Sequence, residues 1–344
     1  MANDLKLEIY KLKLSNKEDG TFTSFRKLFG QKFNNYGNKG TEIITKARIF
    51  NTFYDDFIKK IDSKGYQVNE KKKKGFTIAT DNTPSGPKSH IKHSATETII
   101  SGILDGGKHG RKRSLSSVEN KASQTPIGVK NIVTDRFYFL LYTPLDHNEA
   151  ILMIQGYSEI KISDVFRDHL VNYFKFNKQI SSKVELFVPQ SLKDKYLESA
   201  VFKSIKFSSG WAIKPDIDEK ITSKDYEVEI KIEIIDKSKK KVNYKKFREI
   251  ISLFSKSKFK PEGGVERNLG EFDKKNATMI SKTKPKAIDF QDEDNVIPTI
   301  LLEEEGITVG EGGVPNFDEI NLYCRELLTE IIEEVMPNHG IDDL

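Results

Sequence analysis

The sequence has a single cysteine, Cys324, and no long apolar segment. One cysteine cannot form an intramolecular disulfide or a zinc site built from several thiolates. No apolar run approaches the roughly 20 residues that a membrane-spanning helix needs. The N-terminal stretch is charged from its start and lacks the apolar core of a secretory signal. We therefore expect a soluble, cytoplasmic protein without membrane attachment.

Motifs that would fix a reaction are also missing. No serine lies in a nucleophile elbow, and no dinucleotide-binding glycine fingerprint occurs. Residues 102–108 begin like a phosphate-binding loop, but His109 stands where that loop carries the serine or threonine that holds magnesium. His90 and His93 fall in an expected loop, so they lack the fixed geometry of a helical metal pair. We expect no metal and no cofactor, except Mg²⁺ under the nuclease alternative below.

The chain does contain the residues of a folded core. Hydrophobic residues make up 37% of it and aromatic residues 10%, more than a disordered chain of this length would carry. Apolar periodicity predicts helices over residues 41–61, 163–176 and 317–335 and strands over 136–143 and 149–155, with a loop over 81–96. Strands and helices mix without regular βαβ alternation. The sequence therefore predicts an α+β fold with mixed or mainly antiparallel sheets and flanking helices. We expect two subdomains, a basic one over 1–210 and a smaller one over 211–344 with an acidic C-terminal helix.

Charge is distributed unevenly along the chain. Residues 287–344 contain sixteen acidic residues and one basic residue, Arg325, and so carry a formal charge of −15. Because the whole chain has a net charge of +5, residues 1–286 carry +20. Neutralisation of phosphates by lysine and arginine is the main source of sequence-independent affinity for nucleic acid. A lysine-rich composition can equally cover an ordinary solvated surface, so clusters of cations carry more weight than the average charge.

The densest cationic cluster follows a predicted strand and spans residues 106–113. Glycine lets backbone N–H groups approach a phosphate closely, and arginine donates two hydrogen bonds at once. The alternative is a solvent-exposed hairpin end with incidental charge. The predicted nucleic-acid-binding residues are Lys108, His109, Arg111, Lys112 and Arg113, together with Lys71, Lys72, Lys73, Lys74, Lys239, Lys240 and Lys241.

Two further stretches, residues 25–33 and 239–248, interleave cations with aromatic residues. Aromatic side chains can stack on bases while lysines neutralise phosphates. At helical spacing, however, aromatic residues more often belong to a core. We therefore expect attraction of the nucleic-acid backbone by the lysines rather than base stacking by the aromatic rings.

A metal-dependent nuclease is the alternative enzyme hypothesis. Asp216, followed by Glu229 and Lys231 in a predicted strand, resembles the order of the PD-(D/E)xK nucleases. Residues i and i+2 share one face of a strand, so a carboxylate and a lysine would converge beside a second carboxylate that binds Mg²⁺. Glu-x-Lys occurs at three further places in the chain, so the triplet is common in this composition. The same residues would also suit the solvated face of a half-buried strand.

The leading hypothesis is a nucleic-acid-binding protein with largely sequence-independent contacts to the phosphate backbone. Such a protein would suit a bacterial antiviral defence or DNA-transaction system. A third hypothesis is a non-enzymatic interaction subunit, in which the acidic residues 289–344 bind a basic protein partner. An oligomer is compatible with each hypothesis.

Overall fold

The computed structural model divides the chain into two compact units. The first comprises Met1–Phe187 and Ile300–Leu344, and the second comprises Val188–Thr299. This division differs from the expected boundary after residue 210, because the C-terminal segment belongs to the first unit. The described residues are 4–18, 20–33, 45–62, 65–84, 86–119, 124–175, 180–198, 201–212, 227–237, 244–260, 266–281, 284–290, 296–297, 299–310 and 313–336.

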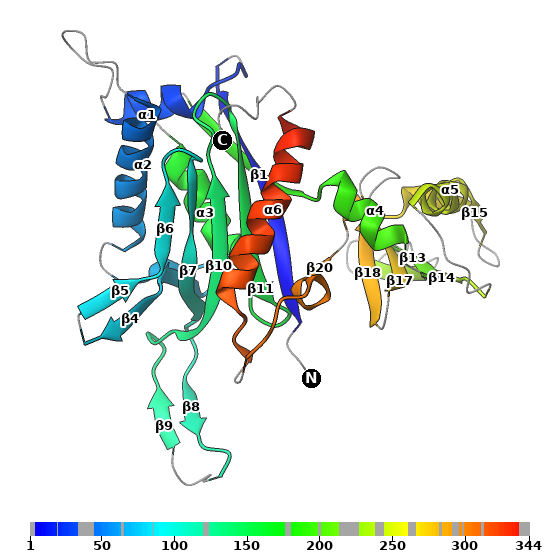
Figure 1. The fold of residues 1–344 in the computed structure, drawn as a ribbon. Coiled ribbons are helices and arrows are strands. Elements are labelled where there is room, and N and C mark those ends of the chain that lie inside the picture. The colour runs from blue at the N-terminus through cyan, green and yellow to red at the C-terminus, as the bar shows by residue number, and fades with distance from the viewer. Residues whose placement is uncertain are drawn as a thin grey trace, which may run out of the picture. The chain divides into compact units, whose positions relative to one another are not determined.

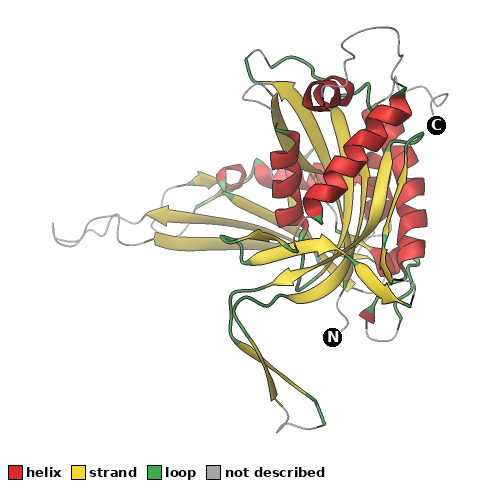
Figure 2. Cartoon of the chain, turned by 90° about the vertical axis from the view of Figure 1, so that its left-hand side faces the viewer, coloured by secondary structure: helices red, strands yellow, loops and turns green. Residues whose placement is uncertain are grey.

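The first unit is built on a nine-stranded antiparallel sheet with the order β12-β1-β11-β10-β7-β3-β2. Two short strands join it off this path, since β20 pairs with β1 and β6 pairs with β7. Its strands are β1 (Leu5–Asn16), β2 (Gln67–Asn69), β3 (Lys74–Ile78), β6 (Ile91–Ser94), β7 (Ile99–Lys108), β10 (Val133–Tyr142), β11 (Glu149–Tyr157), β12 (Ile180–Phe187) and β20 (Ile300–Leu301). Figures 1 and 2 show that the sheet curls and that α6 and α3 lie on opposite sides of it.

Three helices cover one face of this sheet, namely α1 (Phe25–Phe33), α2 (Lys46–Ile61) and α3 (Ser163–Phe174). Phe50, Phe53 and Phe57 recur at helical spacing in α2 and are fully buried against the sheet and the other two helices. Phe29 stacks on Phe53 with ring centroids 4.3 Å apart. The Thr45 side chain caps α2 by accepting a hydrogen bond from the next turn. The apolar stripe of α2 therefore defines this core.

Strand β1 contributes side chains to both faces of the sheet. Leu12 and Leu14 belong to the core under α1, α2 and α3, whereas Leu5 and Leu7 have the opposite parity and are buried outside that core. The residues of β1 pair with those of β11 in an unbroken register. The two sets of buried leucines therefore face opposite sides of a regular strand, and no bulge separates them. On the other side of the sheet, α6 (Phe317–Val335) contacts β10 and buries an apolar stripe of its own.

Two small ribbons extend the first unit. Strands β4 (Thr80–Thr83) and β5 (Gly86–Ser89) pair with each other, as do β8 (Arg113–Ser116) and β9 (Gln124–Ile127). Figure 1 shows the β8–β9 ribbon projecting from the end of β7 and β10. Every residue of β8 is exposed, and β9 is nearly as exposed. We call residues 108–130 the arm.

The second unit contains a five-stranded antiparallel sheet with the order β14-β13-β17-β18-β19. Helix α5 packs against it, so that Phe247 and Ile251 bury Ile205 and Phe207. The helices and strands of this unit are α4 (Gln190–Glu198), β13 (Val201–Ala212), β14 (Glu227–Ile235), α5 (Tyr244–Ser255), β15 (Lys258–Phe259), β16 (Arg267–Asn268), β17 (Lys274–Ser281), β18 (Lys284–Phe290) and β19 (Val296–Ile297).

These elements confirm the predicted α+β class, with antiparallel sheets and flanking helices. The loop expected over residues 81–96 is wrong, because most of β4, all of β5 and all of β6 lie there. These four-residue strands carry no periodic apolar pattern, and pairing with a neighbouring strand gives them their structure. None of the described helices combines the length and apolarity needed to cross a membrane.

Candidate nucleic-acid interface

The arm concentrates cations at the place where it leaves the sheet. Residues 106–134 include six lysines and arginines but one acidic residue, Glu119. One of the cations, Lys121, lies outside the described residues. The other five are exposed, and no ion pair is recorded for any of them within the described part of the chain: Lys108, Arg111, Lys112, Arg113 and Lys130. Their charge is therefore available to an external anion.

Two glycines of the predicted cluster, Gly106 and Gly107, do not form the phosphate-binding loop that we expected. Gly106 and Gly107 are buried inside β7 rather than exposed in a loop. A Cβ on Gly107 would lie 1.8 Å from the backbone oxygen of Val133 on β10. Gly107 thus allows β7 and β10 to approach each other, Gly106 makes room for Ile162, and neither lines a phosphate site. Gly110 forms the turn into the arm, with a left-handed φ of +87°.

His109 anchors the arm rather than extending from it. Its backbone N–H donates to the Lys73 carbonyl at 3.0 Å. The side chain is half-buried, and its Nε2 has no hydrogen-bond partner among the described residues. Because the following Gly110 N–H donates to the Val129 carbonyl at 2.9 Å, both ends of the arm are held at its base.

Two lysines of the run 71–74 are already paired with carboxylates on α3. The Lys72 Nζ lies 2.6 Å from an Asp168 oxygen, and the Lys74 Nζ lies 3.0 Å from an Asp164 oxygen. The second pair is largely buried, with side-chain exposures of 15% and 22%. Because these charges are neutralised within the protein, they offer less to a phosphate than the exposed cations of the arm.

The other predicted lysines differ in their surroundings. Lys73 forms an exposed ion pair of 2.9 Å with Glu70. Exposed ion pairs of this kind contribute little to the stability of the fold, so Lys73 could exchange Glu70 for a phosphate at little cost. Lys71 is exposed, with no ion pair recorded among the described residues. Residues 239–241 lie outside the described residues.

The candidate nuclease residues are only partly described. Glu229 and Lys231 both lie on β14, opposite Gly210 and Ser208 of β13, and Lys231 is exposed. Asp216 and the side chain of Glu229 lie outside the described part of the chain. Among the described residues, no three histidine, cysteine, aspartate or glutamate side chains are grouped so that they could hold a metal ion. The nuclease hypothesis stays a prediction.

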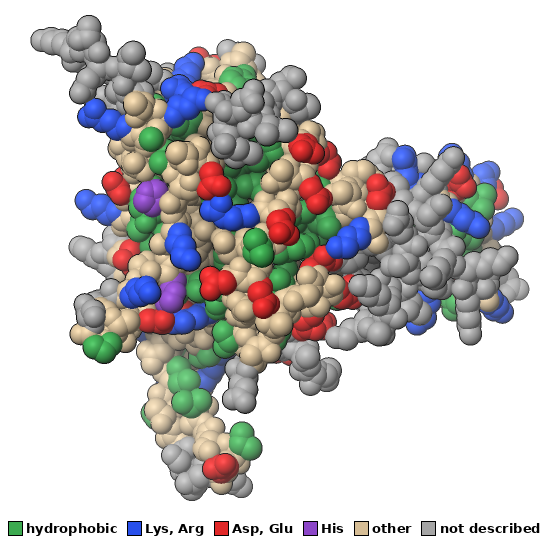
Figure 3. All heavy atoms as spheres, viewed as in Figure 1, with side chains coloured by type: hydrophobic (Ala, Val, Ile, Leu, Met, Phe, Trp, Pro, Cys, Tyr) green, Lys and Arg blue, Asp and Glu red, His purple; other side chains and the backbone are tan. Residues whose placement is uncertain are grey.

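The acidic C-terminal region includes a firmly packed helix. Figure 3 shows acidic side chains along the exposed side of α6. The opposite side buries Cys324 and Leu328 among other apolar residues, and burial raises the pKa of the Cys324 thiol. Arg325, the one cation of residues 287–344, donates two hydrogen bonds to the Glu97 carboxylate at 2.9 and 3.0 Å. The negative charge of α6 is therefore displayed on an ordered surface.

Comparison with known proteins adds no family to these observations. No known family model matches this sequence, and no curated protein matches it. The functional assignment therefore depends on the charge and geometry of the described residues.

A second cationic feature, which the sequence did not reveal, lies among α1, α2 and α3. The prediction for residues 25–33 is partly confirmed, because Phe25 and Phe29 are fully buried in the core. Lys32, at the end of that stretch, lines a cavity with Lys60 and Lys175. These lysines come from distant parts of the chain, and the sequence signal was confined to the neighbouring Lys32 and Phe33.

Proposed function

We propose that this protein binds double-stranded DNA through its phosphate backbone and that the arm is the main contact. The observation that supports this proposal most directly is that Arg111, Lys112 and Arg113 are exposed and form no ion pair with any other described residue. Arginine and lysine that are not neutralised within the protein gain most from contact with phosphates, because binding releases the counterions of the DNA.

The form of the arm favours duplex DNA over duplex RNA. A two-stranded β-ribbon fits the major groove of B-form DNA, which is about 12 Å wide. The major groove of A-form RNA is deep and narrow, so side chains on a ribbon cannot enter it. Cations at the base of a ribbon can then contact the phosphates on either side of the groove.

Apolar side chains on the arm offer a second kind of contact to the DNA. Leu115 is 64% exposed, and Val118 is fully exposed near the tip. Insertion of such side chains between base steps is typical of proteins that bind the minor groove. A ribbon in the major groove would instead place them against the base edges, where they add apolar contact to the phosphate contacts of the cations.

The test is a titration of short duplex DNA at several salt concentrations, with full-length protein. Substitution of Arg111, Lys112 and Arg113 by alanine should weaken binding by at least about tenfold and lower the salt slope by roughly 2 to 3, since each phosphate contact contributes about 0.9. The matched control replaces three exposed lysines outside the arm, Lys17, Lys27 and Lys59. Equal losses in the two triple variants would refute a specific role of the arm.

The wider setting stays a prediction. A basic partner for residues 289–344 is inferred from their negative charge, and a location in the cytoplasm from the lack of a secretory signal and of a long apolar segment in the sequence. A place in antiviral defence or another DNA transaction is a setting that DNA binding would suit. Assays with Mg²⁺ present and absent in the same titration would separate DNA binding from DNA cleavage. Cleavage that Lys231→Ala abolishes would favour the nuclease alternative.

A further inference from the structure

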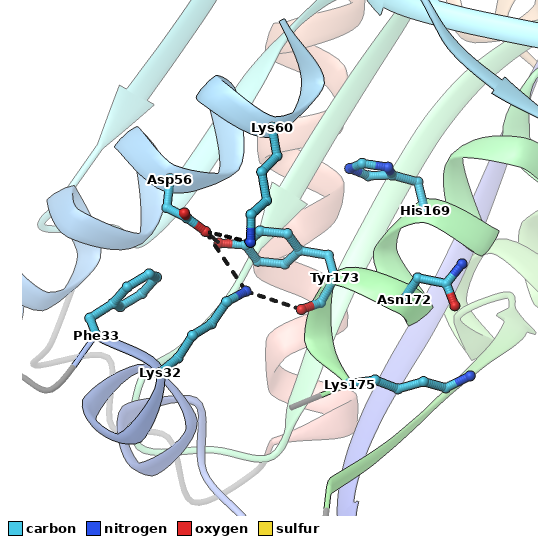
Figure 4. Close-up of a pocket in the computed structure, with 8 residues that line it drawn as sticks. All are labelled: Lys32, Phe33, Asp56, Lys60, His169, Asn172, Tyr173 and Lys175. Carbon is cyan, nitrogen blue, oxygen red and sulfur yellow. Dashed lines mark hydrogen bonds and ion pairs between the residues drawn. The ribbon is translucent and has the colours of Figure 1, made fainter. Parts of the chain in front are cut away.

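The ends of α1, α2 and α3 surround a cavity that contains no residue of the arm and has no part in the proposed contact with DNA. Its volume is about 550 Å³, within the range of sites for small molecules in proteins. Figure 4 shows its lining side chains, which come from all three helices and the residue after α3. They are Lys32, Phe33, Asp56, Lys60, His169, Asn172, Tyr173 and Lys175.

The lining carries more positive than negative charge. The Lys60 Nζ lies 3.3 Å from one oxygen of Asp56, and the Lys32 Nζ lies 3.8 Å from the same oxygen. The Tyr173 hydroxyl also donates to this oxygen, at 2.8 Å. One carboxylate is therefore shared by two ammonium groups and a phenol. Lys175, for which no ion pair is recorded among the described residues, adds a third cation to the lining.

Lys32 is the most confined of these cations. Its side chain is 10% exposed, and its Nζ lies 3.3 Å from the centre of the Tyr173 ring. The same Nζ donates to the Tyr173 carbonyl at 3.1 Å. Burial and the nearby charge of Lys60 lower the pKa of Lys32 to about 8. The charged form of Lys32 is thus held without a full counter-charge, which an anion in the cavity would supply.

The opposite wall offers neutral hydrogen-bonding groups. Figure 4 shows the His169 ring directed toward Lys60. The buried Nε2 of His169 has no hydrogen-bond partner among the described residues. Burial lowers the pKa of this imidazole to about 4, so it is neutral at pH 7 and can donate one hydrogen bond or accept one. The Asn172 amide lies on the same wall.

We propose that this cavity binds a small organic molecule through a phosphate monoester, with Lys32, Lys60 and Lys175 around the phosphate. A doubly charged phosphate matches the excess of cations better than a carboxylate, which carries one charge. The cavity is also larger than a phosphate ion, and Phe33 and Tyr173 give it apolar surface for the organic part of the ligand. This inference does not depend on DNA binding by the arm.

This mode of binding requires the protonated form of Lys32, so above pH 8 it takes up a proton at this residue. The titratable groups that face Lys32 across the cavity are Asp56, Lys60, His169, Tyr173 and Lys175. His169 is neutral throughout pH 7 to 9, and burial together with the hydrogen bond to Asp56 raises the pKa of Tyr173 far above that window. A phosphate monoester is already doubly charged above pH 7. Affinity should therefore fall roughly tenfold between pH 7 and pH 9 as Lys32 loses its proton.

The experiment is calorimetric titration of the full-length protein with adenosine 5′-monophosphate and ribose 5-phosphate, each compared with its unphosphorylated counterpart. We expect at least one phosphorylated compound to bind at least about tenfold more tightly than its counterpart. Lys60→Gln and Lys175→Gln should each weaken that binding about tenfold. Lys59→Gln removes the same charge from an exposed neighbour on α2 that does not line the cavity, and it should change the affinity less than about twofold.

Three results would overturn the proposal. These are the absence of binding by either phosphorylated compound at millimolar concentration, equal effects of Lys59→Gln and Lys60→Gln, and an affinity that does not fall above pH 8. Thermal melting of each variant distinguishes a lost site from a lost fold. The arm variant with Arg111, Lys112 and Arg113 replaced should bind the phosphorylated compound normally, so failure at the cavity and failure at the arm are separable.

Discussion

At the residue scale, Gly107 shows how closely β7 and β10 approach each other at the base of the arm. A Cβ at this position would lie 1.8 Å from the Val133 backbone oxygen, so alanine must push the two strands apart. Gly107→Ala should lower the free energy of unfolding by about 2 to 3 kcal/mol, as overpacking does. Gly128→Ala is the control, because no atom lies within 4 Å of a Cβ there. Equal urea midpoints for the two variants would contradict this account.

His169 gives the fold a dependence on pH. It contacts Phe57 and Phe76, and burial lowers the pKa of its imidazole from 6.5 to about 4. The unfolded chain therefore binds this proton more readily, and stability that is complete above pH 6.5 is lost as the pH falls. Between pH 7 and pH 5 the loss from this group is about 2 kcal/mol. His169→Phe should reduce the fall in urea midpoint over that interval, and an unchanged fall would contradict the assignment.

At the scale of elements, regular periodicity could be predicted from sequence and irregular pairing could not. The predicted helix over residues 317–335 coincides with α6, and the predicted strands 136–143 and 149–155 correspond to β10 and β11. These segments alternate or repeat apolar residues over several turns or strand positions. The ribbon β4–β5 is instead rich in proline, glycine and polar residues, and sequence patterns of that kind predict a loop.

The residues of the candidate site could likewise be predicted only where they are neighbours in the sequence. The cationic cluster of the arm was visible in the sequence because its residues are neighbours. Pairing of Lys72 with Asp168 and of Lys74 with Asp164 was not visible, because the partners lie 96 and 90 positions away. The cavity was hidden for the same reason, since its lysines meet only when three helices pack together.

The arm as an element should be dispensable for folding. Its strands pair only with each other among the described residues, and they are exposed. Replacing residues 112–127 by a short glycine-serine turn keeps the hydrogen bonds at the base and should shift the melting temperature by less than about 2 °C. The same variant should lose most of its affinity for duplex DNA. A large fall in melting temperature would show that the arm supports the core, and unchanged affinity would place DNA contact elsewhere.

At the scale of the whole molecule, the second unit is inserted at one point of the first. Strands β12 and β20 pair with the same edge of β1, one after the other. Phe187 ends β12 opposite Ile9, and Ile300 begins β20 opposite Leu7. Two positions along a strand span about 7 Å. A boundary based on composition after residue 210 misses this arrangement, because β20 and α6 return to the first sheet after more than a hundred residues.

This topology predicts that the first unit folds without residues 188–299. Joining Phe187 to Ile300 through a short glycine-serine linker should give a monodisperse protein with one cooperative melting transition, because the ends to be joined already lie close together. The comparison is a truncation after residue 210, which removes β20 and the apolar stripe of α6. That truncation should expose one face of the sheet and aggregate. If instead the linked protein aggregates and the truncated one melts cooperatively, α6 is not part of the first core, and the division of the chain lies where composition alone would place it.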